Sequence, residues 1–127
     1  MKNKKNTPTT AELEILNVLW EDEPRSVKEI HKELSKVKNV GYTTTLKIMQ
    51  NMTAKGMLDR KPEGKCHLYF TNIPKTDTQQ NLINRLVDSA FGGSASSLVM
   101  QLLGNKKTSE KELNEIKRII EEIEKNQ

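Results

Sequence analysis

The chain has 127 residues, a length that fits one or two small domains. Its formal net charge is +4, and all of this excess lies in residues 1–72, which hold 13 Lys and Arg against 9 Asp and Glu. Residues 73–127 hold 8 Lys and Arg against 8 Asp and Glu, so their charges balance. An excess confined to the first part is what a nucleic-acid surface there would need, although +4 also suits an ordinary solubilising surface.

Several classes of protein are disfavoured by composition. A single cysteine, Cys66, excludes a disulfide within the chain and fits the cytoplasm. No apolar run approaches the ~20 residues that span a bilayer, so no membrane insertion is expected. The chain lacks the motifs and histidine content of an enzyme site. Cys66 and His67 would point to opposite faces of a strand, so no metal or cofactor is expected.

Two short capped helices are expected first. Thr9 and Glu12 have the spacing of a capping box, and Ser26 and Glu29 repeat it. Apolar residues cover most of the first helix, which must therefore be buried on more than one side. In the second helix, His31 is expected in solvent.

The segment 42–54 predicts a helix with two contrasting faces. The residues at the spacing of a buried face are Thr45, Ile48, Met49 and Met52. The opposite stripe contains Thr43, Lys47, Gln50 and Ala54, lacks acids, and carries side chains able to reach phosphates and base edges.

Other roles are open for the first residues of this helix. Thr43 and Thr44 could cap it, a role compatible with DNA contact because a helix N-terminus can also receive a phosphate, and Tyr42 could either pack on the domain or touch a phosphate. The methionines Met49, Met52, Met57 and Met100 are expected in the core.

Residues 59–65 predict a strand end and a tight turn, with Pro and Gly supplying the turn geometry. Arg60, Lys61 and Lys65 would lie near the tip, where they suit backbone phosphates. The strand 66–71 alternates, but both of its faces are partly apolar, so either could face the core.

The order helix, helix, turn, helix, hairpin predicts a winged helix-turn-helix domain at 9–73, after a flexible basic tail at 1–8. Residues 74–127 predict three helices, so the fold is mainly α with a small β-wing. Three short helices bury too little apolar surface to be stable alone, which favours dimerisation over packing on the first domain. The expected dimerisation residues are Leu82, Leu86, Phe91, Leu98, Val99, Leu102, Leu113, Ile116, Ile120 and Ile123.

Several segments together resemble a known family. They are Thr10–Leu16 with Trp20, Val27–Ile30, Tyr42–Thr44, Lys55–Arg60 with Tyr69, Phe91–Ser94 and Ser97–Val99. Over nearly its whole length the chain resembles the penicillinase repressors of the BlaI/MecI type, which share a broader family with copper-responsive CopY repressors.

The resemblance implies a dimeric repressor that binds palindromic operators in double-stranded DNA, often at β-lactamase or sensor genes. The contacts that it implies on the third helix are Thr43, Thr44, Lys47, Gln50 and Asn51. Leu46 and Ile48 stand where relatives often carry Arg or Thr, which leaves the target sequence open.

The resemblance also implies relief of repression by a cut in the second helix of the dimerisation domain, made in response to a membrane β-lactam sensor with a zinc-protease domain. Well-known members have an Asn-Phe pair at that place, and this chain has Gln101 and Leu102. The copper branch uses Cys-x-Cys pairs near the C-terminus, which this chain lacks. A repressor answering another signal, such as a metal or small ligand, and a winged-helix antirepressor that contacts only proteins are the alternatives.

Overall fold

The computed structural model describes residues 7–104 and 108–127. Most of the tail expected at 1–8 and the loop at 105–107 lie outside the described residues. Within the described part, no helix combines the length and the apolar character needed to cross a bilayer.

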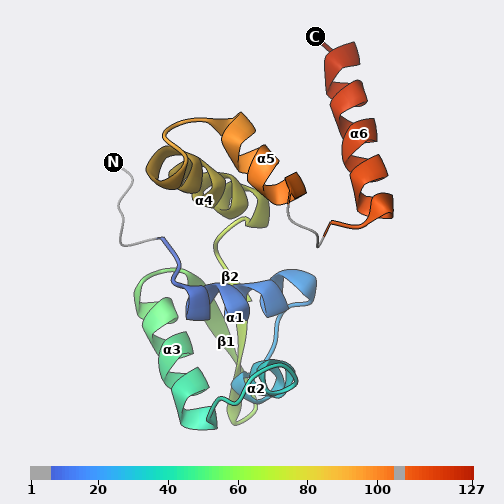
Figure 1. Ribbon diagram of the computed structural model, residues 1–127. Helices are drawn as coiled ribbons and strands as arrows, with labels where there is room; N and C mark the ends of the chain where they lie inside the picture. The colour runs from blue at the N-terminus through green and yellow to red at the C-terminus, as the bar shows by residue number, and fades with distance from the viewer. Residues whose placement is uncertain (1–6, 105–107) are drawn as a thin grey trace. The chain divides into compact units, whose positions relative to one another are not determined.

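The first of two compact units, Met1–Leu82, has the element order of a winged helix-turn-helix (Figure 1). Its main elements are α1 (Thr10–Glu21), α2 (Val27–Ser35), α3 (Tyr42–Ala54), β1 (Leu58–Glu63) and β2 (Cys66–Thr71). The two strands form an antiparallel hairpin. Backbone bonds of 3.0 and 2.7 Å between Arg25 and Tyr69 add a short bridge beside β2. The predicted fold, mainly helical with a small β-wing, is confirmed.

Local sequence signals fix the starts of the first two helices. The Thr9 hydroxyl accepts the Glu12 N–H at 3.2 Å, and the Glu12 carboxylate accepts the Thr9 N–H at 2.9 Å. Ser26 and Glu29 make the same exchange at 3.1 and 2.9 Å. Both predicted capping boxes are therefore confirmed, and each satisfies N–H groups that a helix start would otherwise leave unpaired.

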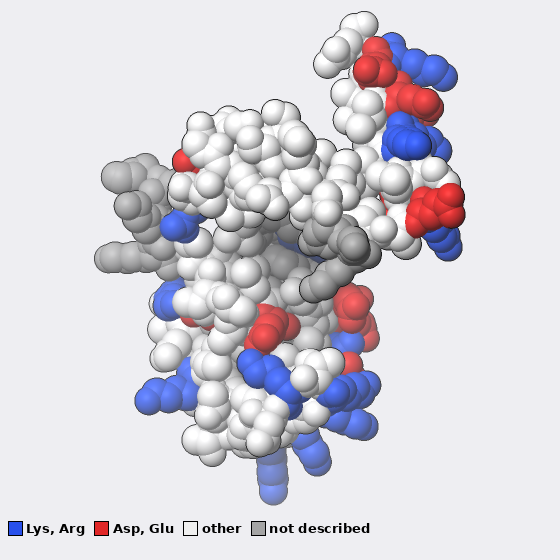
Figure 2. All heavy atoms as spheres, in the orientation of Figure 1, with Lys and Arg blue, Asp and Glu red and all other residues white. Residues whose placement is uncertain are grey.

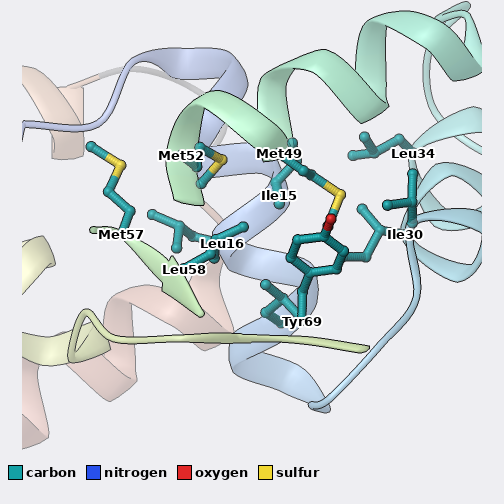
Figure 3. Packing of buried hydrophobic residues seen from close by; sticks show 11 residues of the cluster. Ile15, Leu16, Ile30, Leu34, Met49, Met52, Met57, Leu58 and Tyr69 are labelled. Atoms are coloured by element: carbon teal, nitrogen blue, oxygen red, sulfur yellow. The ribbon is translucent and has the colours of Figure 1, made fainter. Parts of the chain in front are cut away.

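The core lies where the three helices meet the hairpin (Figure 3). Its most deeply buried apolar members are Ile15, Leu16, Leu19, Ile30, Met49, Met52, Met57, Leu58 and Tyr69. Tyr69 points from β2 toward Met49 of α3, so its side of β2 is the inner face (Figure 3). Each large side chain buried in this way stabilises the fold by about 1.5–3 kcal/mol relative to exposure, which holds α3 firmly in place.

The hairpin is more regular than predicted. β1 continues to Glu63, and the turn is confined to Gly64 and Lys65. Gly64 has a φ of +62°, a conformation that residues with a Cβ rarely adopt, and this lets the strands stay paired up to a two-residue turn.

In the second unit, Ile83–Gln127, the residues that the structure describes form helices and the connections between them. It contains the second half of α4 (Lys75–Ala90), together with α5 (Ala95–Gly104) and α6 (Glu110–Lys125). The division between the units falls inside α4, whereas the boundary expected from sequence at 73–74 precedes that helix.

The helices of the second unit bury little within one chain. No described residue of α5 or α6 is buried. The prediction that Met100 belongs to a core is wrong for the single chain, because its side chain is 74% exposed. Three short helices enclose too small an interior to cover it.

Candidate nucleic-acid interface

The outer side of α3 forms an exposed polar face on the first unit. We call it the outer stripe, and its members are Thr43, Thr44, Lys47, Gln50 and Asn51, all exposed. Thr45, Met49 and Met52 on the inner side are fully buried. The two-faced helix predicted from sequence is therefore confirmed, although Ile48, predicted on the inner side, is only partly buried.

The first turn of α3 leaves the outer hydroxyls free of capping. Gly41 is the N-cap residue, and no side chain caps the helix. The alternative that Thr43 or Thr44 caps α3 is therefore wrong, because the helix begins at Tyr42 and both threonines lie inside its first turn.

Tyr42 lies partly at the surface at the start of α3. Its side chain is 47% exposed, and its ring meets the His31 ring edge-on, with the centroids 5.6 Å apart. The prediction that His31 lies in solvent is wrong, since α3 covers one side of it and leaves it half-buried. Tyr42 thus packs on the domain and still presents part of its ring outward.

The far end of α3 is held by an ion pair. Lys55 Nζ lies 2.6 Å from Glu12 Oε2, which is almost fully buried. Burial raises the pKa of the Glu12 carboxyl, but the hydrogen bond and charge of Lys55 and the hydrogen bonds with Thr9 outweigh it. The net pKa therefore lies below its ordinary value of 4.5. Lys55 accordingly acts in the fold and is not free to bind an anion.

The wing carries its cations on two different faces. In the register of the hairpin, Arg60 lies opposite Tyr69 and Lys61 opposite Leu68. Because successive strand residues alternate, Arg60 shares the inner face with Tyr69, beyond the core, while Lys61 lies on the outer face. Lys65 follows in the turn. All three are exposed, and Arg60 and Lys61 therefore present their charges on opposite sides of the wing.

Ion pairing separates the basic residues of the first unit into two groups. The cations held by carboxylates are Arg25, Lys36, Lys38 and Lys55. Among the residues that the structure describes, no ion pair involves Lys47, Arg60, Lys61 or Lys65. Figure 2 shows Lys and Arg gathered over the end of this unit where α2, the start of α3 and the hairpin tip lie. This end therefore presents unpaired positive charge to a polyanion.

A metal centre has no support in the described ranges, which contain no group of three or more His, Cys, Asp or Glu placed to hold an ion. Cys66 is exposed and lies opposite Glu63 in the hairpin, and His67 lies opposite Pro62. Neighbouring strand residues point to opposite faces, so Cys66 and His67 do not converge.

The residues expected to dimerise stay at least partly exposed in one chain. Those with large exposed fractions are Leu86 at 45%, Val99 at 42%, Leu102 at 55%, Ile120 at 47% and Ile123 at 55%. Those of intermediate burial are Leu82, Phe91, Leu98, Leu113 and Ile116. Apolar exposure on this scale is typical of a surface that a partner covers.

The bond between Gln101 and Leu102 lies inside α5, and both residues are exposed. A shallow hollow lined by Phe91, Ser97, Met100 and Gln101 adjoins it. The bond is therefore accessible at the surface but held in helical conformation.

Sequence reasoning missed two side-chain connections of α3. The capping pattern identified Glu12 but gave no sign that Lys55, 43 residues later, shares its carboxylate. The amphipathic pattern of α2 assigned His31 to solvent, and only the position of α3 beside α2 changes that. One signal could have indicated partial burial of His31. It lies one turn before Ser35, on the edge of α2 next to the buried residues Ile30 and Leu34.

This fold and its basic end define a winged-helix DNA-binding protein, and two solved structures agree. The DNA-binding domain of the repressor BlaI has a TM-score of 0.52 and 31% identity, covering 61% of this chain and 93% of that one. The monomeric form of Bacillus licheniformis BlaI in complex with the blaP half-operator has a TM-score of 0.51 and 31% identity. That match covers 58% of this chain and 90% of the other.

The particular family follows from the whole chain. The penicillinase repressor family model matches residues 8–122, so the chain belongs to that family. Relatives include the penicillinase repressor of Bacillus licheniformis, 30% identical over 112 residues and 88% of each chain. That of Staphylococcus aureus is 26% identical over 98% of this chain and 99% of its own. The methicillin resistance regulatory protein MecI of Staphylococcus aureus strain N315 is 24% identical over 94% of this chain and 98% of its own length. The chain is thus a DNA-binding transcriptional repressor and not an enzyme.

Proposed function

We propose that the chain is a cytoplasmic, homodimeric repressor that binds a palindromic operator in double-stranded DNA. The observation that carries this proposal is the outer stripe of α3, which is exposed, free of acids and backed by fully buried residues. A rigid helix with free polar and basic side chains suits the major groove, where base edges can be told apart.

The contacts divide by chemistry. Members of the outer stripe reach base edges, with Gln50 and Asn51 able to make paired hydrogen bonds to adenine and Lys47 to bind guanine. Tyr42, Arg60, Lys61 and Lys65 bind phosphates, which set the position of the protein without reading sequence. Since Arg60 and Lys61 lie on opposite faces of the wing, they contact the DNA backbone from different sides.

Dimerisation occurs through the second unit. The exposed apolar residues of α4, α5 and α6 support this, because a second copy of the chain can cover them. Twofold symmetry is the commonest arrangement of such pairs, and it would present two copies of α3 about one DNA turn apart. An operator with inverted half-sites follows from that symmetry.

The experiment is selection of DNA from a pool of randomised duplexes, followed by binding assays at rising salt. We expect inverted half-sites whose centres lie about 10–10.5 base pairs apart or at a multiple of this. Affinity should fall steeply with salt because bound lysine and arginine release counterions. An antirepressor that contacts proteins alone would enrich no sequence.

The regulated genes are those of β-lactam resistance or its sensing. Support comes from the relatives, whose names tie them to penicillinase and to methicillin resistance. A membrane sensor protease relieves repression by cutting the bond between Gln101 and Leu102, two exposed residues of α5. Cleavage there would remove α6 from its own unit and so break the dimer.

This regulation is tested in the native host grown with and without a β-lactam. Mass spectrometry should find a new chain end at Leu102 only in treated cells, together with loss of the intact repressor. Induction of the selected target genes while the chain stays intact would contradict cleavage and favour a repressor that answers another signal.

A further inference from the structure

A chain of long hydrogen bonds runs from α2 to the start of α3. The buried Thr45 hydroxyl lies within donating distance, 3.4 Å, of the Gly41 carbonyl. The same oxygen lies 3.4 Å from His31 Nδ1, so the hydroxyl links the imidazole to the start of α3. On the other side of the ring, His31 Nε2 lies 3.4 Å from the Ser35 hydroxyl.

The same imidazole also supports Tyr42. The two rings are nearly perpendicular, at 84°, and their centroids lie 5.6 Å apart, a favourable edge-to-face arrangement. His31 thus contacts α3 twice, through the ring of Tyr42 and through Thr45. No side chain caps α3 at Gly41, so the contacts with His31 link the first turn to α2 in place of a cap.

We propose that His31 is a positioning residue for DNA binding, which sets the Tyr42 ring and the first turn of α3 from the neighbouring helix. His31 lies on α2, outside the outer stripe, and acts through Tyr42. This inference rests on the proposed function, since the first turn carries Tyr42, Thr43 and Thr44 toward the DNA.

The experiment compares His31→Ala, His31→Phe and Ser35→Ala in the full chain, with the palindromic duplex selected by the unchanged protein and a shuffled duplex of equal length as probes. His31→Ala should weaken binding to the palindrome about two- to tenfold. His31→Phe keeps a ring beside Tyr42 and should retain most of the affinity that His31→Ala loses. Ser35→Ala removes only the contact to Nε2 and keeps the ring beside Tyr42, so it should weaken binding much less than His31→Ala does.

A double-mutant cycle with Tyr42→Ala separates positioning from general damage. If His31 acts through Tyr42, His31→Ala should cost much less in the Tyr42→Ala background than alone. Without DNA, the ring proton signals of Tyr42 should shift in His31→Ala, and much less in Ser35→Ala, which leaves the ring contact in place. The chain has two tyrosines and Tyr69 is buried, so the signals can be told apart.

The outcomes are distinct. Equal palindrome binding by His31→Ala and the unchanged protein, or additive losses in the cycle, would overturn the role of His31 alone. Failure of the unchanged protein to prefer any selected palindrome over the shuffled duplex would overturn the proposed function and this inference with it. Thermal unfolding of each variant verifies that binding is measured on folded protein.

Discussion

Lys55 Nζ lies 2.6 Å from one carboxylate oxygen of Glu12, and the other oxygen accepts the backbone N–H of Thr9 at 2.9 Å. One buried side chain thus closes the N-terminus of α1 and holds the C-cap residue of α3. At the opposite end of α3, His31 of α2 contacts Tyr42 and Thr45. Both ends of the helix that carries the outer stripe are therefore tied to a neighbouring helix by side chains.

Glu12→Gln should destabilise the first unit by about 1 kcal/mol at neutral pH, because the amide keeps the shape but loses the charge-assisted bond to Lys55. Glu33→Gln is the matched control, since Glu33 also pairs with a lysine but is more exposed. It should change the free energy of unfolding less. Urea unfolding followed by circular dichroism measures both variants.

The contribution of the Glu12 charge should depend on pH. Its folded-state pKa is lowered, so the stability that it provides is fully present above the ordinary pKa of 4.5 and is lost as pH falls through the folded-state value. The difference in unfolding free energy between the unchanged protein and Glu12→Gln should therefore shrink in acid. A constant difference from neutral pH to pH 3 would show that the charge of Glu12 contributes nothing.

Lys47→Ala and Thr44→Ala should each weaken specific operator binding by about 1–3 kcal/mol if these side chains contact bases. Fluorescence anisotropy with the selected palindrome provides the measurement. Lys117→Ala, which removes the same charge from an exposed position on α6, is the control and should leave affinity nearly unchanged. Normal affinity in both α3 variants would remove the outer stripe from the interface.

Those features of the fold that depend on neighbours in sequence could be predicted from it. The capping boxes at Thr9 and Ser26 and the two faces of α3 follow from spacing within one or two turns. The inner face of β2 could not be predicted, because both faces carry apolar residues and the choice of Tyr69 depends on helices packed against the hairpin. The half-burial of His31 depends likewise on tertiary packing.

The same distinction applies to the site. Exposure of the outer stripe followed from periodicity, whereas the pairing state of each lysine did not. Lys38 pairs with Glu14, 24 residues away, and Lys55 with Glu12, so neither remains free although the sequence gives both the same charge as Lys47. Charge counting therefore overestimates the basic surface available to DNA.

Wing variants should affect binding differently from variants of α3. Lys61→Ala and Arg60→Ala should weaken binding to the palindrome and to a shuffled duplex by similar factors, because phosphates are the same in every sequence. Each should reduce the slope of log affinity against log salt by about 1. Titrations at several salt concentrations test this. A loss confined to the palindrome would instead assign that side chain to base recognition.

Ile120→Asp should convert the proposed dimer into a monomer, because a charge placed at a covered apolar position is costly to bury unpaired. Ile120 is 47% exposed in the single chain, so the variant should still fold as a monomer. Light scattering coupled to gel filtration measures the mass. Glu122→Lys, a charge change at a neighbouring exposed position of α6, is the control. Palindrome binding should weaken with loss of the dimer, since a single winged helix contacts one half-site. A dimeric mass for Ile120→Asp would exclude this face of α6 from the interface, and a monomeric mass for the unchanged protein at micromolar concentration would contradict dimerisation itself.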